Sequence, residues 1–175
     1  ILTTTLCIGL LLGLLTACSK EIKDTDLVYA SYNATDALLK VARELELYPN
    51  KPILIASFVD VDNVQHSSTL GRTLAEQMGS RVSQHGYKVI EIKLRTNSVF
   101  VRGTKDQDEG EFMLSRELQD LSFQHDAHAV LVGTYGKGPE VVYITAKLVR
   151  TKDSVILGSY DFGLPVGKNT KKMLQ

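Results

Sequence analysis

Two predominantly apolar runs constrain the fold of this chain more than any other feature of its sequence. They cover residues 53–59 and 129–135, and each has the length of a strand rather than of a helix. A strand with apolar side chains on both faces is typical of a parallel sheet that is covered by helices on its two sides. The two runs therefore predict central strands of an α/β sheet.

Three further strands are predicted around this centre. Residues 87–94 alternate between apolar and polar side chains, which indicates a more exposed strand. Residues 140–149 and 154–162 also form strand patterns, and short polar turns connect them to each other and to the preceding strand. Such short connections favour antiparallel hairpins. We expect one face of this pair to be partly solvated.

Helices are predicted where apolar residues recur at three- and four-residue spacing, at residues 30–45, 70–82 and 114–121. Candidate N-caps precede these segments: Asp24 or Asp26, Ser67 or Ser68, and the capping-box spacing of residues 108–111. Gly71 and Gly79 would weaken the second helix unless close packing requires them. Gly86 suits the left-handed end of that helix. Residues 96–107 are predicted to form a loop.

These elements predict one α/β domain over residues 27–166. Its mixed sheet of about five strands has three parallel strands joined by right-handed βαβ crossovers, followed by an antiparallel meander, and it packs with three helices. We expect the strand order 2-1-3-4-5. Residues 167–175 have too little apolar content to pack, so we expect a flexible tail there.

The start of the chain has the profile of a signal peptide. Residues 1–19 are uncharged and contain an apolar block at residues 6–15. An uncleaved transmembrane anchor is the alternative, but it needs about 20 predominantly apolar residues and several threonines dilute this run. Because neither an initiator methionine nor a basic segment precedes Ile1, we expect the natural chain to start earlier.

Residues 15–18 read Leu-Thr-Ala-Cys and resemble the bacterial lipobox, in which the cysteine receives a diacylglycerol and is then acylated at its new amino-terminus. We therefore expect a signal peptide at residues 1–17 and a lipidated Cys18 with a tether in residues 18–26. The alternative is an ordinary buried cysteine. If Cys7 leaves with the signal, the mature protein has no free thiol for a disulfide, a zinc cluster or a nucleophile.

The charge balance argues against nucleic acid as a partner. The chain has 20 Lys and Arg residues, 20 Asp and Glu residues and no Trp. A neutral chain without a basic stripe lacks the electrostatic attraction to phosphates on which such binding depends. We therefore expect no nucleic-acid partner.

The best candidate for a ligand site is the crevice where the predicted strand order reverses, at the carboxyl ends of the first and third strands. Asp60 and Asp62 could face one Mg²⁺ or Ca²⁺ ion and, with His66, support a metal-dependent hydrolase. The calcium-loop pattern fails, however, at Gln65 and Gly71. We expect solvated loop carboxylates and no metal. The candidate crevice comprises six residues: Asp60, Asp62, His66, Ser67, Ser68 and Tyr135.

No catalytic set is recognisable in the sequence. His66 and Ser67 are adjacent, and adjacent side chains rarely face each other; the G-x-S-x-G elbow is also absent. His125 and His128 lack an identifiable third metal ligand. The glycines in residues 133–138 precede Pro139 and another strand, which indicates a turn rather than a phosphate loop. We expect no enzymatic activity, no catalytic residue and no cofactor.

Several segments together resemble the FlgO-type family of flagellar outer-membrane lipoproteins: residues 31–39, 52–60, 67–72, 110–117 and 127–165. The resemblance implies an outer-membrane lipoprotein at the flagellar base that supports flagellum stability or motility without enzymatic activity. It also implies a fold similar to TolB amino-terminal and curli-secretion lipoprotein α/β domains. Ser19 agrees with an outer-membrane location, because Asp after the lipidated cysteine is the usual inner-membrane retention signal.

The expected partners follow from the lipid anchor and from this resemblance. The N-terminal lipid would hold the domain at the outer membrane, on its periplasmic side, and flagellar basal-body or outer-membrane ring components are the expected protein partners. The exposed strand at residues 87–94 could bind a partner through its edge, and a homo-oligomer is a further possibility. The alternative function is an envelope lipoprotein that binds and regulates a cell-wall enzyme or a secretion system.

Overall fold

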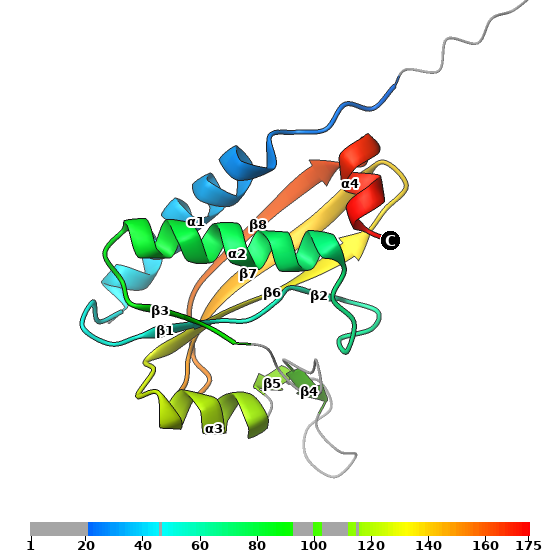
Figure 1. Cartoon of the computed structure of the whole chain (residues 1–175). Helices are drawn as coiled ribbons and strands as arrows, with labels where there is room; N and C mark the ends of the chain where they lie inside the picture. The colour runs from blue at the N-terminus through cyan, green and yellow to red at the C-terminus, as the bar shows by residue number, and fades with distance from the viewer. Residues whose placement is uncertain (1–20, 46, 93–99, 103–111, 115) are drawn as a thin grey trace, which may run out of the picture.

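A computed structural model describes residues 21–45, 47–92, 100–102, 112–114 and 116–175. In this part of the chain a six-stranded mixed sheet forms the centre of the molecule (Figure 1). Its strands are β1 Ile53–Ile55, β2 Val59–Asp60, β3 Val89–Glu91, β6 Ala129–Lys137, β7 Val141–Arg150 and β8 Ile156–Pro165. The helices are α1 Leu27–Glu44, α2 Thr69–Gln84, α3 Arg116–Gln124 and α4 Lys168–Met173.

The strand order confirms the predicted topology. The sheet runs β3-β1-β6-β7-β8, which is the expected order 2-1-3-4-5 when β1 and β2 count as one strand. β1 pairs in parallel with both β3 and β6, whereas β6, β7 and β8 form an antiparallel meander. The α/β class and the mixed sheet are therefore as predicted from the two apolar runs.

The first apolar run is broken into two short strands by a bulge. Ile55 is the partner of Leu131 and Val59 is the partner of Thr134, so the run contains one residue more than β6 between these pairs. Phe58 lies in this bulge, is fully buried, and packs on Gly133 so closely that a Cβ atom on Gly133 would overlap the Phe58 ring. The absence of a side chain at Gly133 makes room for the bulge.

Helices cover the two faces of the sheet unequally (Figure 1). α1 and α2 pack on one face, where Leu38, Leu74 and Met78 join the larger apolar core. α3 packs on the other face, where Leu118 joins a smaller core. The outer face of β7 is partly solvated, as predicted, and the Tyr143 side chain there is 67% exposed.

The predicted start of the third helix is wrong. Within the described residues, β4 Phe100–Arg102 pairs with β5 Phe112–Leu114 in an antiparallel two-stranded sheet. Residues 100–102 are therefore a strand where a loop was expected, and Leu114 belongs to β5 rather than to the helix, which begins at Arg116. Pairing between distant segments overrides the local helical spacing here. The predicted capping box at residues 108–111 lies outside the described residues.

The predicted flexible tail is also wrong, because residues 168–173 form α4. Thr170 is buried, and Met173 and Leu174 pack against the larger core. Asp24 stabilises the beginning of α4 by accepting hydrogen bonds from its backbone N–H groups. A segment of low apolar content folds in this case because a distant part of the chain supplies its N-terminal hydrogen-bond acceptor.

The other caps lie close to their predicted positions. The Asp26 carboxylate accepts a hydrogen bond from Tyr29 N–H and caps α1. Ser68 caps α2 by accepting from Gly71 N–H. Gly86 follows the end of α2 with a φ of 86°, the left-handed conformation expected for it.

Candidate functional site

The predicted crevice lies at the carboxyl ends of β2 and β6, beside the loop that leads into α2 (Figure 1). Asp60 is the register partner of Tyr135, and Val61 N–H donates to the Tyr135 carbonyl at 3.0 Å. The loop that follows β2 folds back onto the end of β2, where Asp60 N–H donates to the His66 carbonyl at 2.9 Å. The structure thus brings residues 60–68 together around the end of β6.

Asp60 is the buried charged group of this region. Its side chain is only 7% exposed, and its Oδ2 atom lies 2.7 Å from Nζ of Lys137. The other carboxylate oxygen accepts a hydrogen bond from Asp62 N–H at 3.0 Å. The hydrogen bond to Asp60 raises the pKa of Lys137. Both oxygens of Asp60 therefore have partners from the chain itself, which is what a buried carboxylate requires.

Ser67, Ser68 and Tyr135 form a second set of contacts. The Ser67 hydroxyl donates to the Phe58 carbonyl at 2.7 Å, and Ser68 N–H donates to the Tyr135 hydroxyl oxygen at 3.0 Å. Tyr135 is fully buried, and Ser68 is 3% exposed. These contacts attach the N-terminus of α2 to the bulge and to β6.

The chemistry of this arrangement is that of a closed polar cluster. Among the described residues, every buried side-chain nitrogen or oxygen atom has a hydrogen-bond partner. In the same part of the chain, no group of three or more His, Cys, Asp or Glu side chains is placed to hold a metal ion. Asp62 and His66 are exposed at the rim. The geometry is suited to fixing the loop of residues 61–67 against the sheet.

Sequence reasoning missed Lys137 as a member of this cluster. Residues 136–139 were expected to form a turn, but β6 extends to Lys137. A signal for this contact exists in the sequence, because residues two apart on a strand share a face and Lys137 is two residues after Tyr135. A buried Asp60 next to that face needs a cation, and Lys137 provides it.

A second polar cluster joins the start of the described chain to its end. Asp24 accepts hydrogen bonds from Asn169 N–H at 2.8 Å and from Thr170 N–H at 2.9 Å. The bond from Thr170 N–H, together with that from Asn169, lowers the pKa of Asp24. Glu21 lies 2.7 Å from Lys168. We call this set of contacts, formed by Glu21, Asp24 and residues 168–170, the tether clasp.

The predicted lipidation site, Cys18, lies outside the described residues, and its lipidation stays a prediction. The tether clasp begins three residues after it in the sequence. None of the described helices is long and apolar enough to span a bilayer.

The model of the FlgO protein family matches residues 32–169 of this chain. The chain belongs to the FlgO family. The matched range begins within α1 and ends within α4, so it includes the whole sheet and the crevice. Membership of this family supports an envelope lipoprotein. A comparison with curated protein sequences finds no match.

Solved structures of similar fold include the LpoB C-terminal domain from Escherichia coli, with a TM-score of 0.50 at 10% identity over 80% of this chain and 98% of that chain. The LpoB C-terminal domain from Salmonella enterica has a TM-score of 0.48 at 10% identity, over 75% of this chain and 98% of that chain. Lipoprotein GNA1162 from Neisseria meningitidis has a TM-score of 0.42 at 17% identity, over 69% of this chain and 84% of that chain. At such low identity, the likeness to the Escherichia coli domain shows the fold alone.

Proposed function

We propose that this FlgO-family chain is an outer-membrane lipoprotein with a structural or assembly role at the flagellar base. Cys18 would bear the lipid after a signal peptide at residues 1–17 is removed, and the domain would stand on the periplasmic side. The observation on which this proposal rests is the family match over residues 32–169. Two or more acyl chains on one cysteine would be sufficient for a stable anchor.

A role without catalysis agrees with the chemistry of the crevice. Two of the residues that could have formed a metal or nucleophile site have partners within the protein: Asp60 pairs with Lys137, and the Ser67 hydroxyl donates to the Phe58 carbonyl. An enzyme would need a nucleophile, a base and an oxyanion donor within reach of one substrate atom. The described residues instead use their polar groups to hold the loop and α2 in place.

Protein partners would meet the edges of the sheet. In the described sheet, β3 and β8 are the edge strands, and β8 is ten residues long. Ser159, Tyr160 and Asp161 are exposed along β8, and its outer side has no paired strand among the described residues. An open edge can add a strand from another chain, either a basal-body component or a second copy.

The test is deletion of the gene in its host bacterium, followed by measurement of swimming and electron microscopy of the flagella. Loss of swimming or of stable filaments, restored by the wild-type gene, is the expected result. Cys18→Ser should fail to restore motility, and the mutant protein should leave the membrane fraction or keep its signal peptide. Normal swimming and normal filaments in the deletion strain would reject the flagellar role.

Crosslinking in intact cells separates this proposal from the alternative function. Mass spectrometry identifies the crosslinked proteins, and basal-body or outer-membrane ring proteins should dominate among them. A dominant cell-wall enzyme or secretion component would instead support an envelope lipoprotein that binds and regulates such a protein. The FlgO fold is compatible with that outcome, but the flagellar proposal is not.

A further inference from the structure

The described chain begins three residues after the proposed anchor, and its first residues, 21–24, are folded onto the C-terminal helix. In the tether clasp, Asp24 accepts two backbone hydrogen bonds from the start of α4, and Glu21 pairs with Lys168. Gly167 makes this approach possible, because a Cβ atom there would lie 2.5 Å from Cγ of Asp24. The tether of residues 21–26 is therefore part of the folded domain at its α4 end.

This contact limits the distance between the domain and the anchor. Cys18 and Asp24 are six residues apart, and Cys18 and Glu21 are three residues apart. At no more than about 3.6 Å per extended residue, the Asp24 Cα atom must lie within about 22 Å of the Cys18 Cα atom. The Asp24 side chain contacts the start of α4 directly. A lipidated Cys18 would thus hold α4, rather than the opposite end of the sheet, next to the bilayer.

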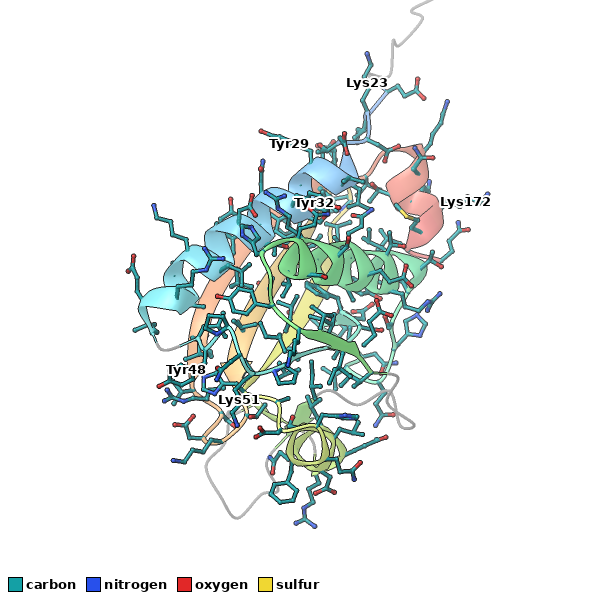
Figure 2. All side chains as sticks on the ribbon, turned by 60° about the vertical axis from the view of Figure 1, so that its left-hand side comes forward. Lys23, Tyr29, Tyr32, Tyr48, Lys51 and Lys172 are labelled. Atoms are coloured by element: carbon teal, nitrogen blue, oxygen red, sulfur yellow. The ribbon has the colours of Figure 1, made fainter. Side chains whose placement is uncertain are left out.

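The surface of this end has the character of a membrane interface. Lys23, Lys171 and Lys172 are exposed, and among the described residues they form no ion pair. The nearby first turn of α1 exposes Tyr29, with 66% of its surface accessible, and Val28. Figure 2 shows Lys23, Tyr29 and Lys172 at the end where the tether leaves the domain, whereas Tyr48 and Lys51 lie at the opposite end. Basic and aromatic side chains are those that favour the headgroup region.

The acidic groups at this end are mostly engaged with the protein itself. Asp24 and Asp26 accept hydrogen bonds at the N-termini of α4 and α1, and Glu21 pairs with Lys168. Glu140 is exposed in the turn before β7, close to Val166. The four carboxylates of Glu21, Asp24, Asp26 and Glu140 balance the four lysines Lys23, Lys168, Lys171 and Lys172, so the described part of this end has no net charge. The covalent lipid would therefore supply the affinity, and the three lysines without an ion pair would select the orientation.

We propose that the end of the domain formed by α4 and the first turn of α1 lies against an anionic phospholipid surface. The tether clasp holds it there, within reach of the lipid on Cys18. This inference rests on the proposed function through the lipidation of Cys18 alone, and it does not depend on the flagellar role.

The orientation can be measured with single-cysteine probes on the lipidated full-length protein. If Cys18 is lipidated and Cys7 is removed, the mature protein offers no other thiol for labelling. Gln175→Cys places a fluorophore just after α4, and Lys152→Cys places one in the turn between β7 and β8, at the other end of the sheet. The proteins are reconstituted in phosphatidylethanolamine and phosphatidylglycerol vesicles that contain a lipid with a nitroxide headgroup. The probe at position 175 should be quenched and the probe at position 152 should not, whereas equal quenching would overturn the proposal.

Charge variants test the lipid chemistry. Lys171→Gln with Lys172→Gln should lower the quenching of the position-175 probe by about twofold or more, since each removed lysine weakens attraction to the anionic surface. The matched control, Lys40→Gln with Lys88→Gln, removes two exposed lysines outside this surface and should leave the quenching unchanged. Replacement of phosphatidylglycerol by phosphatidylcholine should act like the α4 variant. Unchanged quenching in that zwitterionic membrane would reject an anionic lipid as the occupant.

A clasp variant and a mass measurement complete the design. Asp24→Ala leaves the lysines in place but removes the hydrogen-bond acceptor of α4, so it should make the position-175 and position-152 probes more alike in quenching. The mass of the Cys18 peptide is measured first. If Cys18 has no acyl chains, both this inference and the proposed anchor fail; if it is acylated and the position-175 probe is not quenched, only this inference fails.

Discussion

Two glycines of α2 should respond to the same substitution in opposite ways. Gly71 and Gly79 are both buried on the side of α2 that faces the sheet. A Cβ atom at Gly71 would overlap the backbone carbonyl oxygen of Phe58 and would lie 3.0 Å from Cε1 of Tyr135. A Cβ atom at Gly79 would meet only the Ile55 side chain, with Cγ1 at 3.2 Å. The obstacle is therefore rigid backbone at the first position and a movable side chain at the second.

The magnitude follows from these contacts. Alanine gains up to about 1 kcal/mol over glycine inside a helix, while overpacking of a tight core costs about 1–3 kcal/mol. At Gly71 the displaced backbone is also held by two hydrogen bonds, from Ser67 to the Phe58 carbonyl at 2.7 Å and from Phe58 N–H to the Gly71 carbonyl at 3.2 Å. Weakening them adds about 1 kcal/mol each. We expect Gly71→Ala to lose about 2–4 kcal/mol and Gly79→Ala to stay within about 1 kcal/mol of wild type.

Thermal and urea unfolding, followed by circular dichroism, measure this difference. For a domain of this size, about 2–4 °C of Tm corresponds to 1 kcal/mol, so Gly71→Ala should lower Tm by roughly 4–16 °C. Gly79→Ala should shift Tm by a few degrees at most in either direction. If the two variants unfold at the same temperature, the argument that the Phe58 carbonyl excludes a side chain at Gly71 is refuted.

Three further predictions concern charges and a turn. The Arg81 hydrogen bonds lower the pKa of Asp36 from 3.8 to about 2. The stability that this pair contributes is therefore present above pH 3.8 and is lost as the pH falls toward 2. In acid unfolding, the difference in stability between wild type and Asp36→Asn should vanish over that range. Lys137→Met leaves the buried Asp60 carboxylate without its cation and should lower the free energy of unfolding in urea by about 1–3 kcal/mol. The loss is smaller than for a fully buried pair because Lys137 is half-exposed. An unchanged urea midpoint would contradict this prediction. Gly86→Ala should cost about 1 kcal/mol through its positive φ, although nothing obstructs the added methyl group, and a rise in Tm would contradict the strain argument.

The central strands were predictable because burial on both faces of a strand requires a run of apolar residues in the sequence. Residues 53–59 and 129–135 are almost entirely apolar, and a run of that length favours a central strand covered on both faces. Right-handed crossovers then leave few possible strand orders. The bulge at Phe58 was not predictable, since it depends on the register with β6 and on the space above Gly133.

The sequence predicted where the candidate site lies but not which contacts its side chains make. Residues 60–68 and Tyr135 meet at the carboxyl ends of the strands, as the topology requires. The pairing of Asp60 with Lys137 was missed because Lys137 was assigned to a turn and Asp60 to a solvated loop. Only an extension of the strand to Lys137 puts that side chain on the face of Tyr135. In the structure Asp60 is buried and paired with Lys137.

The sequence by itself determined the α/β class, the order of the sheet and the family, because these depend on patterns within a strand or helix or on a resemblance that covers most of the chain. It narrowed each of the caps of α1 and α2 to two residues, between which the structure decided in favour of Asp26 and Ser68. Only the tertiary structure decided that the C-terminal residues form α4 and that Asp24 provides its hydrogen-bond acceptors across about 145 residues of sequence. The β4–β5 pairing was decided in the same way. A hydrogen bond or an ion pair between residues far apart in the sequence depends on which chain segments the completed sheet places side by side. Local periodicity in the sequence does not show which segments these are.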